Sequence, residues 1–109
     1  MENRITDKPY QVVASHNHGD HIGGAGFFDE IWMHPADQNL DSPPFAPTVD
    51  FRKNYAEIIR KREGKYYAYD PETDIRPWPK KPVWKPLTDG QVFDLGGRKV
   101  TALHCPGHT

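Results

Sequence analysis

Residues 15–24 read Ser15-His16-Asn17-His18-Gly19-Asp20-His21-Ile22-Gly23-Gly24, and this stretch holds four candidate metal ligands. Side chains two residues apart in an extended segment project to the same side, so His16 and His18 can reach one cation. Asp20 offers a hard oxygen ligand, and His21, displaced by one position at a turn eased by Gly19, is expected to point toward a second, neighbouring metal. Ligands of these types at this spacing indicate a zinc-binding loop.

The residues on either side of this stretch predict a strand that leads into a loop and then a short helix. Tyr10 to Ala14 is a short apolar and β-branched run, which is typical of a buried strand. Ile22 to Glu30 predicts the short helix, and Ile31 to Met33 the next strand. Because α/β proteins commonly place binding loops at the ends of such strands, a ligand-binding loop is a better interpretation than exposed or core histidines.

Two further helices are predicted from local signals. His34 to Leu40 predicts a short helix with Pro35 near its first turn, where the missing N–H costs least. Asp50 to Glu63 predicts a longer amphipathic helix that stops at Gly64. Its apolar residues recur at helical spacing and form one face: Phe51, Tyr55, Ile58 and Ile59.

The remaining sequence predicts an ordered loop followed by a β-hairpin. Lys65 to Pro86 holds five prolines, so we expect no regular structure there. Residues 91–95 and 98–103 flank Gly96-Gly97 as the two strands of a hairpin. The loop is also rich in aromatic residues, for which we expect packing against the core rather than contact with a substrate: Tyr66, Tyr67, Tyr69, Trp78 and Trp84.

The composition limits the chain to one small domain and excludes several classes of protein. With 109 residues, 36% of them hydrophobic, 11 prolines and 9 glycines, it has material for one domain with many turns. A net charge of -1 offers no attraction to nucleic acid or anionic lipid, so neither partner is expected. The single cysteine, Cys105, excludes an internal disulfide and fits a cytoplasmic location. No apolar run approaches the roughly 18 residues of a membrane span.

The order His-x-His-x-Asp-His followed by Ile-Gly-Gly resembles the first signature of the metallo-β-lactamase superfamily. Leu87 to Gly97, leading to Leu103-His104-Cys105-Pro106-Gly107-His108-Thr109, is similar to that family's segment that ends in a Pro-Gly-His-Thr turn. The resemblance covers roughly Tyr10 to Leu40 and Leu87 to Thr109. It implies an α/β fold: an αββα sandwich, in which two mixed β-sheets pack face to face with helices outside.

The resemblance also implies a ligand set for two metal ions. By it, His16, His18 and His108 hold the first metal, while Asp20 and His21 belong to the second. The family supplies a bridging carboxylate and a final histidine from further along the chain, as well as strands before the first motif. Residues 1–109 are therefore expected to form a partial, N-terminal metallo-β-lactamase-like domain. We place an irregular, aromatic and proline-rich insertion in it at about residues 41–86.

The function implied is a metal-dependent hydrolase that holds two zinc ions in a complete domain, with iron or manganese as other possible metals. Metal-activated water is expected to attack a small ester, thioester, lactone or β-lactam, with Asp20 as the catalytic residue that orients the nucleophile. Two alternatives stay open: a catalytically inactive remnant that binds at most one metal, and an iron-dependent oxygenase of the same fold. The balanced charge disfavours a nuclease.

Three remaining residues with metal-binding side chains are given structural roles. His104 precedes the Pro-Gly-His-Thr turn and is predicted to be structural or to lie behind the metal ligands. His34 is expected at the surface or in packing. Cys105 can bind zinc in principle, but His108 fits the motif better, so a small, partly buried thiol is the preferred interpretation.

Overall fold

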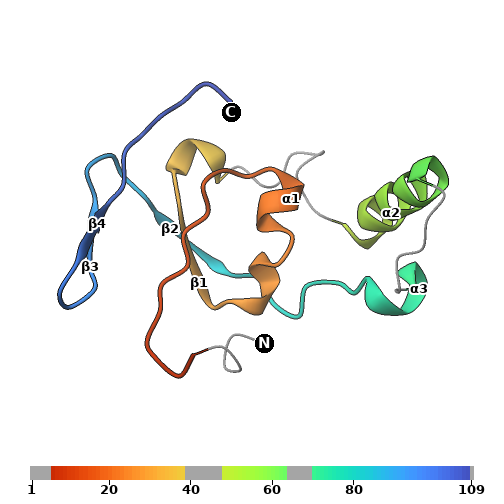
Figure 1. Ribbon diagram of the computed structural model, residues 1–109, viewed down its shortest axis with the longest axis horizontal. Helices are drawn as coiled ribbons and strands as arrows, with labels where there is room; N and C mark the ends of the chain where they lie inside the picture. Colours follow the sequence, from red (N-terminus) through yellow and green to blue (C-terminus); the bar gives the residue numbers. More distant parts are fainter. Residues whose placement is uncertain (1–5, 39–47, 64–69, 109) are drawn as a thin grey trace.

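The computed structural model describes residues 6–38, 48–63 and 70–108, and Figure 1 shows how they are arranged. The described residues form short helices and two small sheets, which confirms the mixed α/β class. In chain order the elements are α1 (Gly19–Ile22), the 3-10 turn η2 (Ala25–Phe27), β1 (Glu30–Met33), the 3-10 turn η3 (Pro35–Asp37), α2 (Val49–Glu63), α3 (Pro71–Asp74), β2 (Val83–Pro86), β3 (Val92–Asp94) and β4 (Lys99–Thr101).

The first sheet is parallel and has β1 in its middle. On one side β2 pairs with β1, with Glu30 opposite Val83. On the other side the extended residues 12–14 lie beside β1, where the Ala14 N–H donates to the Trp32 carbonyl at 2.9 Å. The strand expected at residues 10–14 is thus reduced to a single bridge at Val13. Because all three segments run the same way, their carboxyl ends meet at one edge of the sheet.

The core lies between this sheet and the short helical segment that follows the histidine-rich stretch. Alternate side chains of β1 face it, so Ile31 and Met33 are buried together with Ile22 and Ala25 of the helical segment. Trp78 and Trp84 pack against this cluster, as expected from the sequence. Tyr66, Tyr67 and Tyr69 lie outside the described residues.

Trp78 fixes the helical segment in place. Its indole Nε1 donates a hydrogen bond to the Gly23 carbonyl at 2.9 Å. The Trp78 ring lies so close to Gly26 that a Cβ at that position would be 2.3 Å from two of the tryptophan atoms. Only glycine fits under the ring, so this contact sets how the loop with the candidate ligands sits on the sheet.

The predicted hairpin is confirmed, with shorter strands than expected. Strands β3 and β4 pair antiparallel, and Phe93 lies opposite Val100. The connecting turn uses Gly96 at a φ of 82°, which an L side chain rarely adopts. Phe93 is buried, and its ring meets that of Trp32 edge to face at 5.6 Å. The hairpin therefore contacts the face of β1 that points away from the core.

Helix α2 confirms the predicted amphipathic helix, but most of its apolar face is exposed. Phe51, Tyr55 and Ile58 are 46%, 59% and 60% exposed, while Ala56 is buried. The Lys53 ammonium pairs with Glu72 of α3 at 2.6 Å, so α2 and α3 lie side by side, apart from both sheets in Figure 1. The predicted stop at Gly64 lies outside the described residues. No helix in the described ranges is long and apolar enough to cross a membrane.

The short helix expected at residues 22–30 begins earlier and is interrupted. Helix α1 starts at Gly19, and η2 follows it after Gly23 and Gly24. Two adjacent glycines disfavour a continuous helix because their backbones lose the most freedom on ordering. Glu30 belongs to β1, not to a helix.

The loop expected at residues 65–86 contains two regular elements. Asp70 caps α3 by accepting the Glu72 N–H at 3.0 Å, and Pro71 follows at the first helical position. Strand β2 ends at Pro86. Among the described residues β2 is an edge strand, paired with β1 on one side, so the missing N–H of a proline is tolerated there. The helix expected at residues 34–40 is shorter, a 3-10 turn at Pro35–Asp37, and residues 39 and 40 lie outside the described ranges.

Candidate metal centre

Three imidazoles converge at the carboxyl edge of the parallel sheet. His16 and His18 follow the extended residues 12–14, while His108 arrives from the segment after β4, which runs back toward α1 in Figure 1. One ligand atom from each of these side chains lies within 4.8 Å of the other two. The ring centroids are 4.6 Å apart for His16 and His18, 4.9 Å for His16 and His108, and 4.7 Å for His18 and His108.

His16 is the innermost of the three, and its environment fits a metal ligand. Its Nδ1 lies 2.9 Å from the Ser15 hydroxyl oxygen. Its Nε2 is buried and has no hydrogen-bond partner among the described residues. A buried nitrogen without a partner costs free energy, and a metal ion at this position would remove that cost. When Nδ1 carries the proton and donates to Ser15, Nε2 presents its lone pair to the cluster.

The surroundings of His16 lower its pKa. Burial is the largest cause that lowers the pKa of His16, followed by the three neighbouring imidazoles, of which His21 contributes most. The Asp20 carboxylate acts in the opposite direction. A lowered pKa favours the unprotonated imidazole, which is the form that binds a metal.

The distances between the candidate ligand atoms also fit a tetrahedral metal once these atoms move slightly closer together. Nitrogen ligands at about 2.1 Å from a tetrahedral zinc lie about 3.4 Å from one another. The present ligand atoms are at most 4.8 Å apart, so no pair has to approach by more than about 1.4 Å. His16 and His18 are half-buried and His108 is exposed, so side-chain rotation can supply this movement. The residues present therefore fit a zinc ion held by three imidazoles.

Asp20 and His21 lie beside this group without belonging to it. Both are on α1, and their nearest ionic atoms, Asp20 Oδ2 and His21 Nε2, are 3.6 Å apart. The His21 ring lies 4.1 Å from the His16 ring, whereas 82% of the Asp20 side chain is exposed. Within the described ranges, the group that can hold one metal contains only His16, His18 and His108. The assignment of Asp20 and His21 to a second metal stays a prediction.

The structure places a pair of stacked imidazoles next to this centre, which the sequence did not indicate. His34, directly after β1, and His104, after β4, are parallel within 9° with centroids 4.2 Å apart. No local pattern could have revealed this contact, because the two residues meet only through the tertiary fold. Cys105, expected to be partly buried, is exposed, because the segment after β4 lies at the surface.

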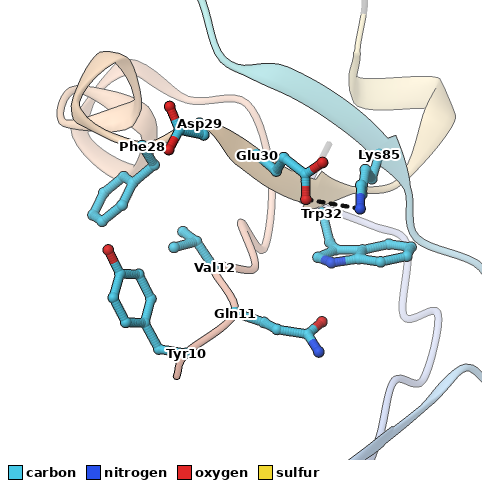
Figure 2. Close-up of a pocket in the computed structure, with 8 residues that line it drawn as sticks. All are labelled: Tyr10, Gln11, Val12, Phe28, Asp29, Glu30, Trp32 and Lys85. Atoms are coloured by element: carbon cyan, nitrogen blue, oxygen red, sulfur yellow. Dashed lines mark ion pairs between the residues drawn. The ribbon is translucent and has the colours of Figure 1, made fainter. Parts of the chain in front are cut away.

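Two of the cavities lined by described residues border the parallel sheet. One, of about 590 Å³, is lined by Ser15 and Pro106, which lie close in sequence to the candidate ligands His16 and His108, and by the stacked pair His34 and His104. The other, of about 560 Å³, lies toward the amino ends of the strands (Figure 2). In it the Lys85 ammonium pairs with Glu30 at 2.8 Å and lies 5.2 Å from the centre of the Trp32 ring. Neither cavity is lined by a candidate ligand itself. The lining of the first cavity therefore includes sequence neighbours of two candidate ligands, and the lining of the second does not.

Comparison with known proteins agrees with this geometry. The family model described as the metallo-beta-lactamase superfamily matches residues 7–109. The human acyl-coenzyme A thioesterase MBLAC2 is 27% identical over 109 residues, the bovine protein of the same name 32% over 103, and the chicken protein 28% over 115. Each alignment covers 94% of this chain and 35% of the relative, so the chain spans about a third of the length of these relatives. No solved structure matches. The chain belongs to the metallo-beta-lactamase superfamily.

Proposed function

We propose that this chain carries the first metal centre of a zinc-dependent hydrolase that acts on thioesters. The observation that supports this most directly is the convergence of His16, His18 and His108, with the buried Nε2 of His16 lacking a partner among the described residues. Sequence signatures alone leave esters, thioesters, lactones and β-lactams open. The name of the relatives, acyl-coenzyme A thioesterase, favours the thioester among them.

The residues of the centre have separate tasks in this proposal. A bound divalent cation supplies a Lewis acid that polarises a carbonyl and makes water nucleophilic near neutral pH. His16, His18 and His108 hold that ion through neutral imidazoles, and the Ser15 hydroxyl orients His16. The exposed Asp20 carboxylate is our candidate catalytic residue, because it can accept a hydrogen bond from the attacking water and so orient it.

The cavity beside the centre supplies the place for the substrate. Its lining combines apolar side chains, among them Val13, Leu87 and Leu103, with the polar side chains of His34 and His104. Such a mixed wall suits the acyl part of a small thioester whose carbonyl has to reach the metal ligands at the Ser15 and Pro106 end.

A second candidate function is binding of one metal ion without hydrolysis. It is favoured by the composition of the ligand group, which among the described residues holds three imidazoles and no carboxylate. In this case the chain binds one zinc ion with the same three histidines, but Asp20→Asn changes no activity because none is present.

Metal analysis and a hydrolysis assay test the proposal together. Metal-free protein is titrated with zinc, iron and manganese, and the loaded protein is then assayed with an acyl-coenzyme A, an oxygen ester, a lactone and a β-lactam. We expect one tightly bound zinc, with thioester cleavage faster than the other reactions. His18→Ala is expected to weaken zinc binding more than about 100-fold, beyond the range typical of residues behind the ligands.

Asn17→Ala is the matched control, because Asn17 lies between two candidate ligands and belongs to no ligand group. Its zinc affinity is expected to match that of the unchanged protein. Zinc affinity that survives in His18→Ala contradicts the proposed centre. Zinc binding without cleavage of any of the four substrates supports the second candidate, and preferential iron binding supports the oxygenase alternative.

A further inference from the structure

The segment that carries His108 has little regular structure to hold it. It begins after β4, and residues 103–108 are all exposed and belong to no helix or strand. Ordering such a segment costs conformational entropy, so specific contacts are needed to keep His108 facing the other two imidazoles. The contacts that the structure supplies are concentrated at Ala102 and His104.

The first contact extends the hairpin by one pair of backbone hydrogen bonds. Ala102 donates to the Gln91 carbonyl and accepts from the Gly90 N–H, both at 2.8 Å. The turn before β3 makes this possible because Gly90 adopts a φ of 77°, in the region that favours glycine. Within the described part of the chain, the backbone pairing ends at Ala102, six residues before His108.

The second contact is a hydrogen bond to His104, two residues after the last backbone pair. The Asp89 carboxylate Oδ1 accepts the His104 N–H at 2.8 Å, across fifteen positions of sequence. A hydrogen bond with a charged acceptor is roughly twice as strong as a neutral one. The His34 ring then stacks on the His104 ring at 4.2 Å, so the backbone and the side chain of His104 are both held.

An aspartate in a turn ordinarily accepts a hydrogen bond from its own backbone two positions later. Asp94 behaves in this way, since its Oδ1 accepts the Gly96 N–H at 2.9 Å. Asp89 instead reaches the incoming segment, so its role is not explained by the turn alone. Asp89 lies in the turn before β3 and Asp94 at the end of β3, and both are exposed, which makes Asp94 a natural control.

We propose that Asp89 is a positioning residue for the metal centre: by holding the backbone of His104, it sets where His108 meets His16 and His18. This inference rests on the proposed metal binding. It adds that the third ligand is placed through a carboxylate that itself lies outside the ligand group. Loss of the Asp89 carboxylate leaves the hairpin and the first two ligands in place but frees the segment that carries the third.

The contact is tested first without metal, by amide hydrogen exchange. The His104 N–H is expected to exchange at least tenfold faster in Asp89→Ala than in the unchanged protein, as an order-of-magnitude expectation for loss of one protecting bond. The Ala102 and Leu95 amides report on the hairpin and are expected to keep their exchange rates. Asp89→Asn retains an acceptor and is expected to restore most of the protection at His104.

The role of Asp89 at the centre is tested with zinc and cobalt. Zinc affinity of Asp89→Ala is expected to fall about 10- to 100-fold, the range typical of residues that orient ligands. The cobalt absorption spectrum of Asp89→Ala is expected to change as it does in His108→Ala. Asp89→Asn is expected to lose only a few-fold in affinity, because its bond to His104 is no longer assisted by charge. Asp94→Ala and Asp94→Asn are expected to bind zinc as the unchanged protein does.

The outcomes separate this inference from the proposed function. If His108→Ala weakens zinc binding while Asp89→Ala does not, the positioning role of Asp89 is refuted and the metal centre stands. If neither His18→Ala nor His108→Ala affects zinc, the centre is wrong and the inference fails with it. If Asp89→Ala fails to fold, the Asp89→Asn and Asp94→Asn pair decides, since equal zinc affinity in these two variants counts against the role.

Discussion

Replacing Gly26 by alanine tests how the histidine-rich loop is seated on the sheet. The added Cβ would lie 2.3 Å from Cβ and Cγ of Trp78, so the backbone at one of the two positions has to shift together with the ring. Overpacking of this kind costs about 1–3 kcal/mol, and displacing the Trp78 bond to the Gly23 carbonyl adds about 1 kcal/mol. Alanine offsets about 0.5–1 kcal/mol by restricting the unfolded chain. The net expectation is a loss of roughly 2 kcal/mol.

Urea unfolding followed by circular dichroism measures this loss. For a domain of this size the same change lowers Tm by about 8–16 °C. Gly24→Ala is the control, because nothing lies within 4 Å of a Cβ there and its φ of -93° suits any residue. The cost of Gly26→Ala is expected to disappear in a Trp78→Gly background, because glycine at position 78 removes both the Cβ and the Cγ that the added group would meet. If Gly26→Ala and Gly24→Ala unfold at the same urea concentration, the Trp78 ring does not lie on Gly26 and the seating described here is wrong.

Three further predictions concern the centre and its surroundings. Ser15→Ala removes the hydroxyl beside His16 Nδ1 and is expected to weaken zinc binding about tenfold, whereas Ser15→Thr keeps the hydroxyl. Isothermal titration of zinc into both variants checks this, and equal zinc affinities contradict the prediction. Cys105→Ser is expected to change the free energy of unfolding by less than about 0.5 kcal/mol. In the unchanged protein, the Cys105 thiol is expected to react with a thiol reagent at the rate of an exposed cysteine, and slow labelling contradicts the exposed position. The pKa of His16 is lowered in the folded state, so the unfolded chain binds more protons than the folded chain below about pH 6.5. The free energy of unfolding of the metal-free protein is therefore expected to fall as the pH drops through that point, and to fall less in His16→Gln. Urea melts at several pH values measure this dependence, and an identical dependence on pH in the two proteins contradicts the prediction.

Local patterns predicted the elements whose signals lie within a few residues. The helical spacing of Phe51, Tyr55 and Ile58 located α2, and the glycines at 96 and 97 located the hairpin. The same spacing gave no information on what α2 packs against, and most of the apolar face that it predicted is exposed. Periodicity reports that a face is apolar, whereas its burial depends on tertiary contacts.

Strand β2 was missed because its own composition argues against it. Val83-Trp84-Lys85 stands between two prolines in a proline-rich segment, and its pairing partner β1 lies far away in the sequence. Parallel pairing needs such a distant partner, so no short-range hairpin signal announces it. The stack of His34 on His104 and the bond from His104 to Asp89 were hidden for the same reason.

The candidate ligands show the same division. His16 and His18 were grouped from their spacing alone, because neighbouring residues of an extended segment have a fixed relation. His108 was added to this group only through the family resemblance. In the structure, one ligand atom of His108 lies within 4.8 Å of a ligand atom of each of the other two histidines. The spacing also suggested that Asp20 and His21 face a second metal. Whether they do depends on further ligands besides these two residues.

X-ray absorption at the zinc edge tests the three-histidine centre most directly. Zinc-loaded protein is compared with His16→Ala, His18→Ala and His108→Ala variants at the same zinc occupancy. We expect three imidazole nitrogens at about 2.0–2.1 Å in the unchanged protein and one fewer in each variant. A sulfur ligand at about 2.3 Å, or an imidazole count that the three variants leave unchanged, would contradict the centre formed by His16, His18 and His108.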